Sequence, residues 1–167
     1  MLKKTMTRTA VTILAAIIAL FAAMPAHAGQ TYALKGGYKV DVPKGFNKTD
    51  AKDNEIEFAN KSGAFVNIEI DKNEYGDMTL KEIGKELKKG IKSGIKISSS
   101  GVQDLGSHKA YVMEGISVED GVKVLMQFYV IKFKDYVFMM TCVCPAENSA
   151  NNRAAFLSIA ESIGKKK

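Results

Sequence analysis

Residues Tyr136 to Cys144 read YVFMMTCVC, and this stretch decides the fold because it is apolar on both faces of a strand. Successive side chains of a strand point to opposite faces, so a strand with one wet face has a polar residue at every second position. Here only Thr141 interrupts the apolar run. A strand that is apolar on both faces has to be covered on both faces. We therefore expect a sheet with a helix on each side.

Three further strands are predicted just upstream, which makes this half of the chain a meander. Period-two alternation places them at 97–105, 109–118 and 122–133, with turns at Gly106-Ser107, Asp120-Gly121 and Lys134-Asp135. Asp120-Gly121 is the clearest hairpin signal, because both central residues of such a turn need positive φ.

The preceding residues predict more strands and a first covering helix. Alternation indicates strands at 38–42, around Ile56 and Phe58, and at 64–70 beyond a hairpin loop at 60–63. Thr79 and Glu82 have the spacing of a capping box, which opens a helix that we expect to end near Ser93. Its apolar face consists of Leu80, Ile83, Leu87 and Ile91.

A second helix is predicted near the last residues of the sequence. Asn148 or Ser149 can cap it, and its apolar face carries Ala155, Phe156, Ile159 and Ile163. Gly164 and the lysines at 165–167 are stop signals. We therefore predict an α+β fold, with an antiparallel sheet of about six to seven strands flanked by helices on both faces (an α/β/α sandwich).

Residues 1–28 predict a secretory signal peptide. Lys3, Lys4 and Arg8 precede an apolar run at 10–23, and Ala26 and Ala28 supply the small residues that a signal peptidase requires. The run is shorter than the roughly 20 residues needed to span a bilayer, which argues against an uncleaved anchor. We expect cleavage after Ala28, leaving one soluble domain at 29–167 in the periplasm or outside the cell.

The charge of that domain argues against nucleic-acid binding. Of the 24 basic residues, three lie in the signal, so 21 basic residues stand against 18 acidic ones. Proteins that bind nucleic acids usually carry a much larger excess of positive charge.

Four motifs carry a family resemblance. They are GYKVDVPKGF at 37–46, TLKE at 79–82, GSHKAY at 106–111, and the last helix with Phe156, Ile159 and Ile163. In this order they resemble the PsbP-like family, which includes the DcrB-like envelope proteins and the Mog-type Ran-binding proteins. Many relatives have tryptophan after the first-strand proline, where this chain has Phe46. The resemblance implies an α/β/α sandwich and accessory, partner-binding roles without a shared catalytic motif, so no functional residue is carried over.

One segment has the spacing of a calcium loop. From Asp71 to Glu82, oxygen-bearing residues occupy positions 1, 3, 7, 9 and 12, and glycine occupies position 6. These weak metal-ligand candidates are Asp71, Asn73, Asp77, Thr79 and Glu82. Tyr75 stands at position 5, where calcium loops have a ligand, and a strand precedes the loop. A strand-to-helix connection also needs such residues for turns and capping.

Cys142 and Cys144 are the two cysteines of the chain. Residues two apart in a strand are separated by roughly 6.5–7 Å between Cα atoms, at or beyond the usual span of a disulfide. Two buried thiols, a strained C-x-C disulfide, a soft-metal site and an intermolecular bond are all open interpretations.

His108 is the single histidine after the signal peptide, so a base-assisted hydrolase would have to use it. Asp104 and Ser107 lie nearby in sequence, but neighbouring residues of a hairpin rarely converge into a triad. A solvated turn histidine is the alternative interpretation.

Lysines gather on one arc of the first helix and in the tail. They are Lys81, Lys85, Lys88, Lys89, Lys92 and Lys165 to Lys167. They could touch anionic lipid headgroups or an acidic partner, or form an ordinary solvated face.

These observations favour an exported, non-enzymatic accessory or binding domain of the cell envelope. Its sheet edge, or a groove between helix and sheet, would engage a protein or a small ligand, and no cofactor is expected. The alternatives are a metal-binding protein that uses Asp71 to Glu82 or the cysteine pair, and a small hydrolase that uses His108.

Overall fold

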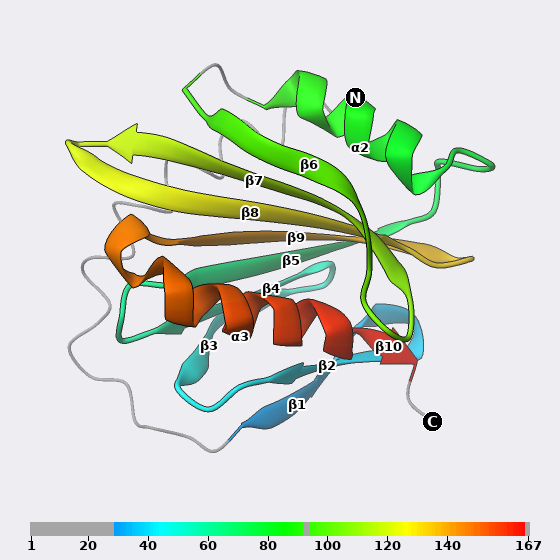
Figure 1. The fold of residues 1–167 in the computed structure, drawn as a ribbon. Coiled ribbons are helices and arrows are strands. Elements are labelled where there is room, and N and C mark those ends of the chain that lie inside the picture. Colours follow the sequence, from blue (N-terminus) through cyan, green and yellow to red (C-terminus); the bar gives the residue numbers. More distant parts are fainter. Residues whose placement is uncertain (1–28, 92–93, 166–167) are drawn as a thin grey trace.

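The computed structural model describes residues 29–91 and 94–165, and its main element is a seven-stranded antiparallel sheet (Figure 1). The strand order is β3-β4-β5-β9-β8-β7-β6. The strands are β3 (Phe46–Lys52), β4 (Glu55–Asn60), β5 (Phe65–Lys72), β6 (Lys96–Asp104), β7 (Lys109–Glu119), β8 (Val122–Lys132) and β9 (Tyr136–Pro145). This sheet agrees with the predicted α+β class and strand number. The predicted signal peptide and its cleavage site lie outside the described residues.

The predicted meander is present with small shifts of its boundaries. β6, β7, β8 and β9 are consecutive and pair antiparallel with their sequence neighbours. Asp120 and Gly121 have φ values of 50° and 81°, so the Asp-Gly turn has the positive φ values that its sequence predicts.

A second sheet of three strands was not foreseen. It has the order β1-β2-β10, from β1 (Gln30–Ala33), β2 (Tyr38–Val42) and β10 (Gly164–Lys165). Helix α3 ends at Ser162, just before the predicted stop signals. Gly164 pairs with Lys39 and Lys165 with Tyr38, so these two residues also form a short strand that was not predicted. A two-residue strand depends on its long-range partner, which local sequence does not reveal.

Within the residues that the structure describes, two helices of three or more turns accompany the sheets (Figure 1). Helix α2 (Leu80–Gly90) begins with the predicted capping box, in which Glu82 N donates to Thr79 Oγ1 and Thr79 N donates to Glu82 Oε2. Helix α3 (Ser149–Ser162) follows the 3-10 turns η3 (Ala146–Asn148), and η2 (Lys35–Gly37) precedes β2. Asn148 precedes α3, but its side chain donates to Ser62 O rather than capping the helix.

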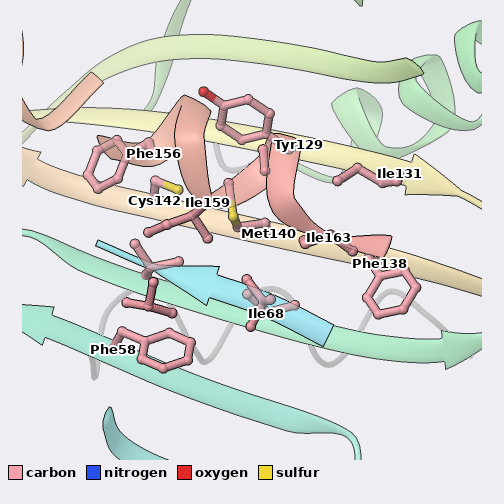
Figure 2. Close-up of a cluster of buried hydrophobic side chains, with 14 of the residues drawn as sticks. Phe58, Ile68, Tyr129, Ile131, Phe138, Met140, Cys142, Phe156, Ile159 and Ile163 are labelled. Carbon is pink, nitrogen blue, oxygen red and sulfur yellow. The ribbon is translucent and has the colours of Figure 1, made fainter. Parts of the chain in front are cut away.

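The buried apolar residues form two clusters that use alternate residues of the same strands. The cluster around α3, which also includes residues of β2, takes Leu125, Tyr129 and Ile131 from β8. Figure 2 shows Phe156 and Ile159 of α3, and Ile163 just after the helix, near the strand residues of this cluster. The cluster around α2 contains Ile83 and Leu87, and takes Val124, Met126, Phe128 and Val130 from β8. Because neighbouring residues of a strand point to opposite faces, the β8 residues of the two clusters point to opposite faces of that strand.

Helix α2 lies unusually close to β7 because it has glycine at the point of contact. A Cβ atom built on Gly84 would lie 2.1 Å from Cδ1 of Tyr111, whose ring is buried beneath the helix. Only a glycine allows this approach, since real side-chain contacts are far longer. The glycine therefore sets the distance between helix and sheet.

A polar chain joins α3 to β7 and β8. Arg153 donates from Nε and Nη2 to the two carboxylate oxygens of Glu114, at 2.9 and 2.8 Å. Gln127 Nε2 donates to Glu114 Oε2, and Tyr129 OH donates to Gln127 Oε1. The bidentate arginine pair lowers the pKa of Glu114.

Within the described residues, no helix is long and apolar enough to cross a membrane.

Candidate functional site

The seven-stranded sheet ends on one side in β6, an edge strand of nine residues. β6 pairs with β7, and no strand of the described residues pairs with its other side. Its side chains are largely exposed, including Val102 at 45%. An edge strand presents unpaired N–H and C=O groups, which are a template for another strand.

The opposite edge, β3, has the features that discourage strand addition. It has a register shift between Lys48 and Asp50, and charged side chains at Lys48, Asp50 and Lys52. Bulges and edge charges are the usual means by which proteins prevent edge pairing. β6 has its charges at its two ends, Lys96 and Asp104, and an irregularity between Ile97 and Ser99. The segment Ser99–Gln103 is uncharged and in regular register.

His108 lies in a shallow pocket of about 440 Å³ at the end of α3, lined also by Tyr38, Phe133 and Lys165. Ser107 Oγ and His108 Nδ1 are 2.9 Å apart, and the imidazole ring lies 5.5 Å from the Phe133 ring. Burial lowers the pKa of His108. The Asp104 carboxylate accepts a hydrogen bond from Gly106 N instead of orienting the imidazole. The structure therefore brings serine and histidine together without assembling the acid, histidine and serine in series.

The side chains of the calcium-like loop are engaged in local hydrogen bonds. Asn73 Nδ2 donates to the carbonyls of Phe133 and Lys134, while Thr79 and Glu82 form the capping box. Lys132 Nζ donates to the carbonyls of Gly76 and Met78, at 2.6 and 2.8 Å. An ammonium group thus already contacts the loop carbonyls, and it would repel a second cation there.

Asp71 lines a pocket of about 560 Å³ together with Lys35, Asp53, Glu74 and Tyr75. Within the described residues, no three His, Cys, Asp or Glu side chains are grouped so that they could hold a metal ion.

Cys142 and Cys144 are free, buried thiols on the α3 side of β9. Burial raises the pKa of Cys144 to about 11, and it raises the pKa of Cys142 well above its ordinary value. Both thiols therefore favour the protonated form at neutral pH, which makes them poor nucleophiles in the folded chain.

The lysine arc of α2 makes contacts of its own. Lys89 pairs with Glu86 at 2.6 Å, and Lys88 Nζ lies 3.4 Å from Ser100 Oγ on β6. Lys165 pairs with Asp135 at 3.8 Å and lies over the Tyr38 ring. Lys92, Lys166 and Lys167 lie outside the described residues.

One polar group emerges only when the strands are paired. Glu55 and Glu57 of β4 lie opposite Glu69 and Asn67 of β5, respectively, and all four occupy the face of these strands opposite the α3 cluster. We call these four residues the acidic face. Burial raises the pKa of both Glu57 and Glu69, and in each case the nearby Glu55 carboxylate adds to the rise. The alternation of each strand signals a polar face, but only the register brings the carboxylates together.

Comparison with solved structures finds the same fold in proteins of low sequence identity. Cyanobacterial PsbP (CyanoP) from Synechocystis matches with a TM-score of 0.65 at 16% identity, over 87% of this chain and 96% of that chain. The Ran-binding protein Mog1p from Saccharomyces cerevisiae matches with a TM-score of 0.56 at 11% identity, over 84% of this chain and 96% of that chain.

A protein from Bacteroides thetaiotaomicron also matches, with a TM-score of 0.64 at 14% identity over 84% of this chain. The chain spans 50% of the length of that protein. No protein-family model matches the sequence, and a comparison with curated proteins finds no match. The PsbP/Mog1-like fold implied by the sequence resemblance is confirmed, and the likeness establishes the fold alone.

Proposed function

We propose that the chain is an exported, non-enzymatic accessory domain of the cell envelope that binds a partner protein. In this proposal the partner adds an extended segment to β6, antiparallel or parallel, through backbone hydrogen bonds. The observation that carries it is the contrast between the two sheet edges. β3 is bulged and charged, whereas Ser99–Gln103 of β6 is regular, exposed and uncharged.

The layering of the domain supports an edge as the binding surface. We propose that the molecule is an α/β/α sandwich in which α2 forms one outer layer, and α3 with the three-stranded sheet forms the other. If both faces of the sheet are covered, the unpaired backbone N–H and C=O groups of its edge strands are the groups that remain for a partner. Helix α2 contacts β6, β7 and β8, so it packs on one face of β6. The backbone N–H and C=O groups of β6 that point away from β7 have no strand partner among the described residues.

Protein binding is favoured over catalysis by two observations. The fold is shared with Mog1p, which is described as a Ran-binding protein, so this architecture supports recognition of a protein. The Ser107 and His108 pair lacks the orienting carboxylate that base-assisted hydrolysis uses, because Asp104 is bonded to Gly106. The signal-like sequence at 1–28 supports export.

Site-specific photo-crosslinking in the envelope of the producing cell tests the proposal. A photoreactive residue at Val102 on β6 is expected to give a discrete crosslinked protein, whereas one at Lys48, exposed on β3, is expected to give none. Equal crosslinking at both positions would show that contact is not specific to β6. The same species captured only from Lys48 would assign binding to the other edge.

A further inference from the structure

The acidic face concentrates negative charge on β4 and β5, two adjacent strands of the sheet. Glu55 lies directly opposite Glu69 in the antiparallel register. Residues directly opposite on neighbouring strands have Cβ atoms about 4.5–5.5 Å apart, and like charges at that separation destabilise the pair. Asp50 of β3 lies opposite Glu57, which extends the acidic group across a third strand.

Little positive charge compensates these carboxylates. Lys52 pairs with Glu55 at 3.3 Å and with Asp50 at 3.6 Å, but 62% of its side chain is exposed. No ion pair is recorded for Glu57 or Glu69 in the part of the chain that the structure describes. The domain as a whole carries more basic than acidic residues, so the local charge of this group is opposite in sign to the net charge.

A buried amide oxygen lies among the carboxylates. Asn67 is 1% exposed, and its Nδ2 donates to Glu55 Oε1 at 2.8 Å. Its Oδ1 is buried without a hydrogen-bond partner. Native proteins nearly always give such an oxygen a donor, from the chain, from water or from a ligand. A group that binds to this oxygen has to donate a hydrogen bond, and a positive charge on it would be attracted by the three neighbouring glutamates.

We propose that the acidic face binds the guanidinium group of an arginine side chain in a basic segment of a partner protein. A guanidinium is planar and has five N–H donors, so one group can donate to carboxylates on two strands and to the Asn67 oxygen between them. It is also more weakly hydrated than an ammonium group, which favours transfer into a half-buried site. To reach Asn67 Oδ1, the arginine enters between the side chains of Glu57 and Glu69.

A metal ion fits the same residues less well. No three acidic side chains of the described residues are grouped closely enough to coordinate a cation. The directional donors of a guanidinium can bridge such separated acceptors, whereas a metal ion requires its ligands within about 2.0–2.6 Å. This proposal concerns β4 and β5 and is independent of strand addition at β6, so either can fail alone.

Titration with acetylated hexa-arginine amide, followed by NMR of the asparagine side-chain amides, tests the proposal. The peptide is expected to shift the Asn67 side-chain amide signals in a saturable manner. A variant with Glu57→Gln and Glu69→Gln is expected to bind about tenfold more weakly, because it loses charged acceptors. The control Glu86→Gln removes one exposed charge on α2 and is expected to bind like the wild type.

Three results would overturn the proposal. Asn67 signals that do not move would show that the peptide binds elsewhere, or that water alone satisfies the amide. Equal weakening by Glu86→Gln would show a non-specific response to net charge. Equal affinity for hexa-lysine would show that guanidinium geometry has no role. Thermal unfolding verifies that each variant is folded, and the single Glu57→Gln variant gives the same comparison if the double variant unfolds.

Discussion

Substitution of Gly84 by alanine tests how closely α2 packs on the sheet. In a helix interior, alanine is more favourable than glycine by about 1 kcal/mol, so an exposed position would gain stability from this change. At Gly84 the new Cβ would lie 2.1 Å from Tyr111 Cδ1, and two other atoms of the ring lie within 2.4 Å. The ring is 4% exposed and packed within the α2 cluster, so it has little room to move.

The balance of these effects gives the expected magnitude. Forcing a methyl group into a well-packed core costs about 1–3 kcal/mol, and the helix-propensity gain of about 1 kcal/mol offsets part of it. We therefore expect Gly84→Ala to lower the free energy of unfolding by up to about 2 kcal/mol, in place of the gain that alanine gives at an exposed helix position. For a domain of this size, that lowers Tm by up to roughly 8 °C. Urea denaturation followed by circular dichroism measures the change.

A matched control lies in the same helix. Gly90 is the last residue of α2, and nothing lies within 4 Å of a Cβ built there. Gly90→Ala should leave stability unchanged or raise it by up to about 1 kcal/mol. The double variant Gly84→Ala/Tyr111→Leu replaces the ring that the new methyl group would meet. Its loss of unfolding free energy should be smaller than the sum of the losses of the two single variants. If Gly84→Ala were as stabilising as Gly90→Ala, the close packing of α2 on β7 would be wrong.

Three further predictions concern charge and thiols. Glu69→Gln should stabilise the fold by about 0.2–1 kcal/mol at neutral pH, because it removes repulsion from Glu55. Since folding raises the pKa of Glu69, wild-type stability is lost as pH rises through that pKa, so the gain should vanish in acid; a gain independent of pH would contradict this. The Glu114–Arg153 pair should show a coupling of about 1 kcal/mol in a double-mutant cycle near neutral pH. Because folding lowers the pKa of Glu114, that coupling should disappear as the pH falls through the pKa of the folded state. Urea unfolding curves of the four proteins of the cycle, recorded at neutral pH and in acid, measure the coupling. Cys142 and Cys144 should resist maleimide in the native state and both react in denaturant, as mass spectrometry would show; fewer than two labels in denaturant would indicate a disulfide.

The meander could be predicted because its signals are local. The apolar run of β9 and the Asp120-Gly121 turn report strand and hairpin without knowledge of the rest of the chain. β3 gave no such signal, because its sequence FNKTDAK is polar at most positions and its register shifts. β10 is a strand only because Tyr38 and Lys39 lie beside it.

The candidate surfaces depend on pairings that the sequence does not contain. The serine-rich strand β6 was predictable, but its place at the edge follows from the order of all seven strands. Glu55 and Glu57 were visible together on one strand, whereas Glu69 joins them through the register of β4 with β5. The calcium-like spacing from Asp71 to Glu82 was also visible, but turn and capping bonds use several of its side chains.

Hydrogen–deuterium exchange of β6 tests the proposed mode of binding most directly. With the partner identified by crosslinking at Val102, exchange is compared for the free protein and the complex. If the partner adds a strand, the amides of Ser99–Gln103 that point away from β7 should exchange rapidly in the free protein and slowly in the complex. If these amides exchange equally fast in both states while protection appears elsewhere, binding does not occur by strand addition to β6.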